Sequence, residues 1–304
     1  MHERSAGEFG YNHRIKLKEA MNMENNYGRG GRFNSDLAIE RRRPDTNCPG
    51  IQYERGKSMV GEWERIRVSS EEAEAEIGRP RGRYDTLVIA DMSSLDYVDI
   101  EDAADEVSRE LCSLCDTNHI SPYRVLVVGL GNGELTPDAV GPRSVARIEP
   151  TLHIAKDDRE MFDSLGCSEI AVVAPGVCGT NGLDTADIIG GICERICPSL
   201  VIAIDSLAAR SPKRLGTTIQ FSDTGIHPGS GVGLHRSAID ECLTGTPVIA
   251  IGVPTVIDSR LLVEGEPGGP TANMMVCPKD IDTLITNSAK IISGGINRAF
   301  GIIM

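Results

Sequence analysis

The stretch Leu200-Val-Ile-Ala-Ile-Asp-Ser-Leu207 decides the fold class of this chain. Five apolar residues in succession precede Asp205, so the strand that they predict must be buried on both faces. Three more strands with continuous apolar runs are predicted at Arg124–Gly131, Glu169–Pro175 and Pro247–Val253. Such strands are typical of a parallel sheet that helices cover on both faces.

Helical patterns separate these strands, as parallel connections require. Helices are expected at Asp99–Asp116, Asp138–Glu149, Thr185–Ile196 and Lys279–Ile296. Further strands are expected at Met59–Val68 and Tyr84–Ala90, with an edge strand at Thr217–Ser222 and a short helix in 69–78 whose N-cap is Ser69 or Ser70. We therefore expect one α/β domain over about 84–304, a mostly parallel sheet with helices on both faces, and an N-terminal elaboration. Residues 1–35 are polar and rich in Gly, Asn and Arg, and we expect them to be poorly ordered.

The composition narrows the class of protein. The 304 residues carry a net charge of −13, which disfavours direct nucleic-acid binding because no broad positive surface is available. No run approaches about 18 apolar residues, so no membrane span is expected, and the N-terminus lacks the apolar segment of a secretory signal. The nine cysteines, an odd number, favour reduced thiols in a cytosol. A zinc site from Cys112, Cys115, Cys193 and Cys197 is conceivable, but these residues fall in helical patterns, and buried free thiols are the preferred interpretation.

Two aspartates stand at the carboxyl ends of predicted parallel strands, where open α/β sheets place their sites. Asp138 follows Thr136-Pro137 at a predicted helix start, so the helix dipole should favour its ionised form, and this role alone could explain it. Asp205 ends a buried strand, which should favour its protonated form unless it simply accepts backbone N–H bonds. Carboxylates with separated pKa values can act as an acid and a base that activate water against an amide.

Two glycine-rich loops could present backbone N–H groups to a substrate carbonyl. The first, 175–182, contains Gly176 and Gly179, and the second, 225–233, contains His227, Gly229 and Gly231. Ordinary turn chemistry is the alternative. A third glycine-rich stretch, 129–133, lacks the spacing of a dinucleotide fingerprint. The sequence therefore predicts neither a cofactor nor a bound metal.

Asp223-Thr224-Gly225 matches the tripeptide of pepsin-like and retroviral proteases. Those enzymes are all-β, so the α/β pattern lacks the architecture that such an aspartate needs. We expect Asp223 to hold its loop and not to attack a peptide.

Several longer motifs carry a resemblance to a known family. They are Val127–Asn132, Thr136–Pro142, Ala174–Gly179, Ile202–Arg210, Ser222–Gly233 and Pro247–Asp258. In order and spacing they closely resemble the germination protease (spore protease) family of spore-forming Firmicutes, and the similarity runs from about residue 33 to the C-terminus.

The resemblance implies an endopeptidase that degrades the small acid-soluble proteins on spore DNA during germination. It implies an atypical aspartic type, with the two catalytic aspartates matching Asp138 and Asp205, no cofactor, and a fold similar to that of hydrogenase maturation endopeptidases. The family is cytoplasmic, in the spore core, and is made as an inactive homotetrameric zymogen that loses an N-terminal propeptide. Its partners are the substrate proteins, without direct contact with nucleic acid or membrane.

The resemblance also locates a cleavage site. Family sites have an acidic residue, the cut, a hydrophobic residue, Ala and, two positions later, Glu, and Asp36-Leu-Ala-Ile-Glu40 fits this pattern. We expect self-cleavage between Asp36 and Leu37, which makes residues 1–36 the propeptide and 37–304 a single peptidase domain with an elaboration at 37–83. The alternative is that these residues are an ordinary amphipathic snippet.

The chain departs from the family in the longer extension before the cut, in Leu234-His235, and in the short segment between Asp258 and Met274, which puts the tetramer contacts in doubt. Two other functions stay open. One is a metal-dependent maturation endopeptidase of the same fold, in which His227 or His153 joins the acids. The other is a non-enzymatic domain that binds a small molecule with its glycine loops.

Overall fold

The computed structural model describes residues 35–42, 48–232, 236–262 and 274–301. All of them belong to one unit that begins at Asn34. The expected disorder before residue 35 and the departure at Leu234-His235 lie outside the described residues. No helix in the described part of the chain is long and apolar enough to cross a membrane.

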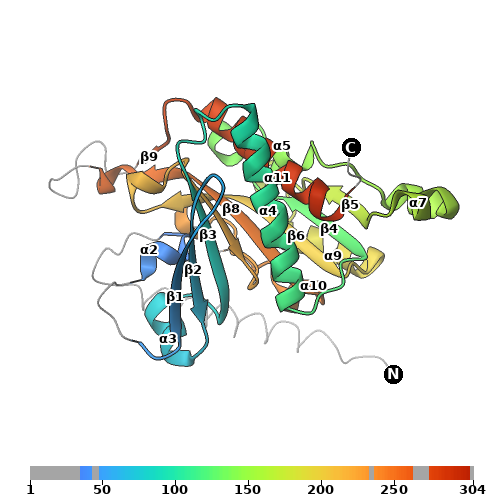
Figure 1. Ribbon diagram of the computed structural model, residues 1–304, viewed down its shortest axis with the longest axis horizontal. Coiled ribbons are helices and arrows are strands. Elements are labelled where there is room, and N and C mark those ends of the chain that lie inside the picture. The colour runs from blue at the N-terminus through green and yellow to red at the C-terminus, as the bar shows by residue number, and fades with distance from the viewer. Residues whose placement is uncertain (1–34, 43–47, 233–235, 263–273, 302–304) are drawn as a thin grey trace, which may run out of the picture. The chain divides into compact units, whose positions relative to one another are not determined.

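One mixed sheet organises the chain (Figure 1). The strand order is β1-β2-β3-β7-β8-β6-β4-β5, and β9 pairs with β8. The strands are β1 (Ile51–Lys57), β2 (Gly61–Val68), β3 (Gly82–Ile89), β4 (Arg124–Gly129), β5 (Glu169–Val173), β6 (Leu200–Ala209), β7 (Thr218–Ser222), β8 (Val248–Asp258) and β9 (Met275–Val276). The four strands β5, β4, β6 and β8 are parallel, whereas β7, β3, β2 and β1 continue the sheet with antiparallel pairs. The predicted α/β class with a parallel core is confirmed.

Helices cover the two faces of the parallel strands. The helices are α2 (Ala38–Arg41), α3 (Glu71–Ile77), α4 (Tyr97–Thr117), η1 (Thr136–Asp138), α5 (Val140–Val145), α6 (Leu152–Asp157), α7 (Arg159–Leu165), α8 (Cys178–Asn181), α9 (Thr185–Ile196), η2 (Pro212–Arg214), η3 (Ser230–Val232), α10 (Glu241–Thr244), η4 (Ser259–Leu261) and α11 (Ile281–Phe300). Val125 and Val127 of β4 join the core beneath α4, α5 and α11, while Leu126 and Val128 join the core beneath α9. This alternation follows from the two-residue period of a strand and explains why β4 is apolar at each position from Val125 to Val128.

Two expectations need correction. The predicted edge strand Thr217–Ser222 is wrong, because β7 lies between β3 and β8 and is buried along its whole length. Its polar side chains find partners elsewhere: Gln220 accepts a hydrogen bond from the Ala38 N–H at 2.7 Å. The predicted helix Asp138–Glu149 is also wrong in its start, since the chain first forms the 3₁₀ turn η1 and only then α5. At α3 the structure selects Ser70 as the N-cap, whose Oγ accepts from the Ala73 N–H at 3.2 Å.

The pairing of β6 positions the site. On one side β6 pairs with β8 from Val201 to Ala209, but on the other it pairs with β4 only as far as Ile204. Beyond Ile204 no described strand pairs with β6 on the β4 side, so the last five residues of β6 present an open edge that begins at Asp205.

A buried ion network joins α4 to the antiparallel strands. The guanidinium of Arg83 donates to Asp85 at 2.6 Å and to Glu110 at 3.1 Å, and Arg65 donates to Glu110 at 2.8 Å. Burial, together with the hydrogen bond and the charge of Glu110, raises the pKa of Asp85 to about 7. The network therefore needs its arginines, because two buried acids without a cation would carry a large desolvation cost.

We predict that Arg83→Ala lowers the free energy of unfolding by about 3 kcal/mol, since Asp85 loses both hydrogen bonds from Arg83 and only the partly exposed Arg65 remains beside the two buried acids. Urea unfolding at neutral pH measures the change. The matched control is Arg81→Ala in the same segment, where an exposed ion pair with Glu74 at 3.3 Å is lost and a change of at most about 1 kcal/mol is expected. Equal losses in the two variants would contradict a structural role of the network.

Candidate active site

Asp138 and Asp205 lie on one cavity of about 290 Å³, which we call the aspartate cavity. Asp205 belongs to the open edge of β6, and Asp138 ends η1, just after the neighbouring strand β4. The other lining residues include Asp36, Gly131, Val177, Gly229 and Arg236. The two predicted carboxylates thus come together at the carboxyl ends of adjacent parallel strands, where such sheets place their sites.

The backbone of Gly131 and Asn132 lies close to Asp138 and fixes its position. Its Oδ2 accepts a hydrogen bond from the Asn132 N–H at 2.8 Å. Gly131 adopts φ +105°, and a Cβ at this position would lie 2.1 Å from the carbonyl oxygen of Asp138. Gly131 is therefore required both by its backbone conformation and by the lack of space.

Asp205 is only 5% exposed. Its Oδ1 accepts from the N–H of the next residue, Ser206, at 2.9 Å. A buried carboxylate with one such bond holds its proton readily, because burial disfavours the charged form.

The pKa values of both carboxyls are raised. Burial raises the pKa of Asp138, although the Asn132 N–H and the charge of Arg236 oppose it. The expected helix start at Asp138 is only the three-residue turn η1, and burial acts on this carboxyl against its ionised form. Burial, and then the charges of Asp138 and Asp36, raise the pKa of Asp205 well above its usual range. Asp205 is therefore the group with the larger tendency to keep a proton.

Sequence reasoning missed Arg236, which is the one basic residue among the described residues that line the aspartate cavity. Its charge lowers the pKa of both Asp138 and Asp205. The available signal was a cation three residues after the end of the glycine-rich loop 225–233.

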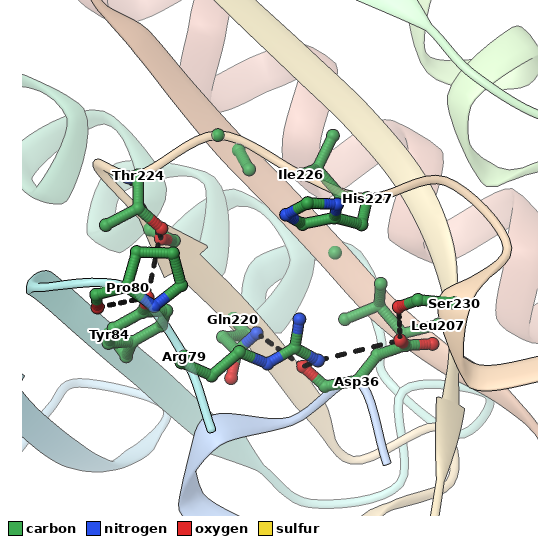
Figure 2. A pocket seen from close by; sticks show the side chains of 14 residues that line it. Asp36, Arg79, Pro80, Tyr84, Leu207, Gln220, Thr224, Ile226, His227 and Ser230 are labelled. Carbon is green, nitrogen blue, oxygen red and sulfur yellow. Dashed lines mark hydrogen bonds and ion pairs between the residues drawn. The ribbon is translucent and has the colours of Figure 1, made fainter. Parts of the chain in front are cut away.

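The segment that contains the predicted cleavage site lies against the open edge of β6. The Asp36 N–H donates to the Ala208 carbonyl at 3.0 Å, and Asp36 lines the aspartate cavity. Leu37 is fully buried and packs with Leu207 and Ala209. Asp36 also lines a second, smaller cavity of about 40 Å³, shown in Figure 2, which we call the Asp36 pocket.

The glycine loops divide between two roles. Gly229 lines the aspartate cavity, and a Cβ on Gly231 would lie 2.1 Å from the Asp36 carboxylate. In the other loop Val177 lines the cavity, whereas Gly176 and Gly179 do not. Gly176 has φ +73°, so turn geometry accounts for it.

The two histidines considered as metal ligands, His227 and His153, do not line the aspartate cavity. His227 lines the Asp36 pocket and not the aspartate cavity, and His153 is exposed on α6. Within the described residues, no three His, Cys, Asp or Glu side chains group as ligands for a metal ion.

Asp223 holds its loop, as expected. It accepts hydrogen bonds from the Arg83 N–H at 2.7 Å and from the Asn118 side chain at 3.2 Å. It lines neither cavity.

Among solved structures, the chain is similar to the NiFe hydrogenase maturation protease HycI from Thermococcus kodakarensis KOD1. The match has 17% identity and a TM-score of 0.31, and it covers 56% of this chain and 92% of the other. Likeness of this degree supports no conclusion about activity.

Similarity in sequence identifies the family more clearly than similarity in structure. A family model described as "Germination protease" matches residues 36–265. The germination protease of Caldanaerobacter subterraneus subsp. tengcongensis is 36% identical over 87% of this chain and 93% of its own length. That of Clostridium perfringens (strain ATCC 13124) is 34% identical over 87% and 94%, and that of Bacillus subtilis (strain 168) is 40% identical over 74% and 63%. This chain therefore belongs to the germination protease family of peptidases.

Proposed function

We propose that this chain is an aspartate-dependent endopeptidase that begins the degradation of small acid-soluble spore proteins during germination. The observation that carries the proposal is that Asp138 and Asp205 share a cavity with Asp36, the acidic residue of a cleavage motif in the same chain. Membership of the germination protease family supports the substrate class. The family resemblance further supports a cytoplasmic location in the spore core and a homotetrameric zymogen.

The chemistry follows from the different protonation of the two carboxyls. Between their pKa values Asp138 is ionised and Asp205 is protonated. Asp138 takes a proton from water, the resulting hydroxide adds to the peptide carbonyl, and Asp205 gives its proton to the carbonyl oxygen. When the C–N bond breaks, the leaving nitrogen receives the proton held by Asp138, and the carboxyl product returns a proton to Asp205.

The same site accounts for a zymogen. In the uncut chain the Asp36 side chain lies at the aspartate cavity and Leu37 is buried beside it. A protein substrate that binds along the open edge of β6 would compete with this segment. Cutting between Asp36 and Leu37 would free the part that precedes the cut.

We predict that Asp138→Asn and Asp205→Asn each slow self-cleavage of the full chain by about 100-fold or more, because each removes one of the two proton-transfer groups. Gel electrophoresis measures the cut fraction, and thermal unfolding establishes that each variant is folded. Asp223→Asn is the control and should retain at least partial activity. An inactive Asp223→Asn chain together with an active Asp205→Asn chain would refute the assignment. Cleavage of a peptide containing Glu-Ile-Ala-Ser-Glu that is lost with a chelator would favour a metal enzyme instead.

The position of the cut is a separate prediction. N-terminal sequencing of the matured chain should begin at Leu37, since Asp36 lines the aspartate cavity and Leu37 is the next residue of the motif. A mature chain that begins at any other residue is incompatible with the proposed junction.

Arg236→Gln should move both limbs of the pH profile of kcat/KM to higher pH. Arg236 lowers the pKa of Asp138, which sets the acid limb, and of Asp205, which sets the alkaline limb, so its removal raises both. The profile is measured with the Glu-Ile-Ala-Ser-Glu peptide. Arg195→Gln, an exposed residue of α9, is the control and should leave both limbs in place. A shift to lower pH, or none, would contradict the role of Arg236.

A further inference from the structure

The Asp36 carboxylate is bound by donors from three separate segments. Its Oδ2 accepts from the Ala208 N–H at 2.9 Å, and its Oδ1 accepts from the Ser230 hydroxyl at 2.6 Å. The guanidinium of Arg79 lies 3.6 Å from Oδ1. Figure 2 shows Arg79 and Ser230 on two sides of Asp36.

Arg79 also binds the backbone of the segment. Its Nη2 donates to the carbonyl oxygens of Ser35 at 3.1 Å and Asp36 at 2.9 Å. The Asp36 carbonyl, which belongs to the bond proposed to be cut, accepts a second bond from Gln220 Nε2 at 3.3 Å. One arginine thus contacts both the side chain and the main chain of the acidic residue.

The space for the carboxylate depends on Gly231. A Cβ on this residue would lie 2.1 Å from Asp36 Oδ2 and 2.6 Å from the Ala208 Cβ. The site therefore has the donors, the charge and the room for one acidic side chain.

Two other residues of the motif, Ala38 and Glu40, also have specific contacts with the rest of the protein. The Ala38 N–H donates to Gln220, and Ala38 is fully buried in a cluster with Ile66 and Tyr84. The Glu40 carboxylate accepts from the Arg210 N–H at 2.6 Å and the Ser211 N–H at 2.7 Å. Both acidic residues of the motif are thus contacted by donors outside it.

Removal of Ser35 and Asp36 would leave the buried charge of Arg79 without its described hydrogen-bond acceptors. The Arg79 side chain is only 14% exposed, and its Nε has no hydrogen-bond partner among the described residues. The partners of its Nη2 among these residues all come from Ser35 and Asp36. A buried cation that loses its partners strongly favours a new acidic ligand in the same position.

We propose that Arg79, Ser230 and the Ala208 N–H form the subsite that selects the acidic residue immediately before the cut in protein substrates. In the uncut chain Asp36 occupies this subsite. The proposal rests on the proposed function as an endopeptidase and names residues that determine its specificity.

Self-cleavage of the full-length chain tests the subsite through a double-mutant comparison. In the otherwise unchanged chain, Asp36→Asn should slow self-cleavage by at least about 10-fold, because it removes the charged acceptor of these bonds. In an Arg79→Ala chain the same Asp36→Asn substitution should change the rate by less than about 2-fold, since the cation that distinguishes the two side chains is absent. Mass spectrometry measures the product at the 36–37 bond over time.

The quantity compared is the ratio of the cleavage rates without and with the Asp36→Asn substitution in the same background. If the Arg79→Ala chain were only partly folded, both rates would fall by the same factor, so partial folding alone would not change this ratio. Arg81→Ala is the matched control and should keep the full ratio, because Arg81 pairs with Glu74 at the surface. An unchanged ratio in the Arg79→Ala chain would overturn the proposal. Absence of cleavage in the unsubstituted chain would instead refute the proposed function.

Gly231→Ala supplies a second test that leaves the charges intact. Its methyl group would take the place of the Asp36 carboxylate, so cleavage of the chain with Asp36 should fall by at least about 10-fold. Cleavage at the original rate would show that the acidic side chain does not bind where the subsite is assigned.

Discussion

The unequal pairing of β6 is the constraint on which the site depends. Because β4 ends at Gly129, opposite Ile204, no described strand pairs with β6 on that side from Asp205 onward. Unpaired N–H and C=O groups of a buried strand need partners, and residues 35–37 supply them at Ala208. The carboxylate of Asp205 and the segment that carries the cleavage motif therefore meet on the same edge.

Burial controls the electrostatics at this edge. Among the residues that the structure describes, three carboxylates (Asp36, Asp138 and Asp205) and one basic residue, Arg236, line this cavity. Desolvation is the largest influence on the pKa of both Asp138 and Asp205, and it exceeds the effect of the cation. One proton shared over the pair is the expected state of two such neighbouring acids.

Patterns of local sequence predicted the parallel core well. Continuous apolar runs identified β4, β6 and β8, and the bounds of α9 match the expected Thr185–Ile196. The predicted places of Asp138 and Asp205 after neighbouring apolar runs were also enough to predict that the two lie together, although β6 continues past Asp205 to Ala209. Contacts between distant segments were not predictable. The polar residues of β7 suggested an edge strand because the contact of Gln220 with Ala38 is not visible in the sequence, and the role of Arg79 depends on its contact with Asp36. The burial that raises the pKa of Asp138 was not predictable either, because it depends on packing that no local pattern records.

The docking of residues 37–40 has a consequence for the chain after a cut at Leu37. Those residues would remain covalently attached, with Leu37 and Ala38 buried and Glu40 held by two backbone amides. A tethered product of this kind has a high effective concentration at its own binding site. Each incoming substrate would have to displace it, so the new N-terminal arm would act as a permanent competitor that sets a threshold of affinity for what the enzyme cuts.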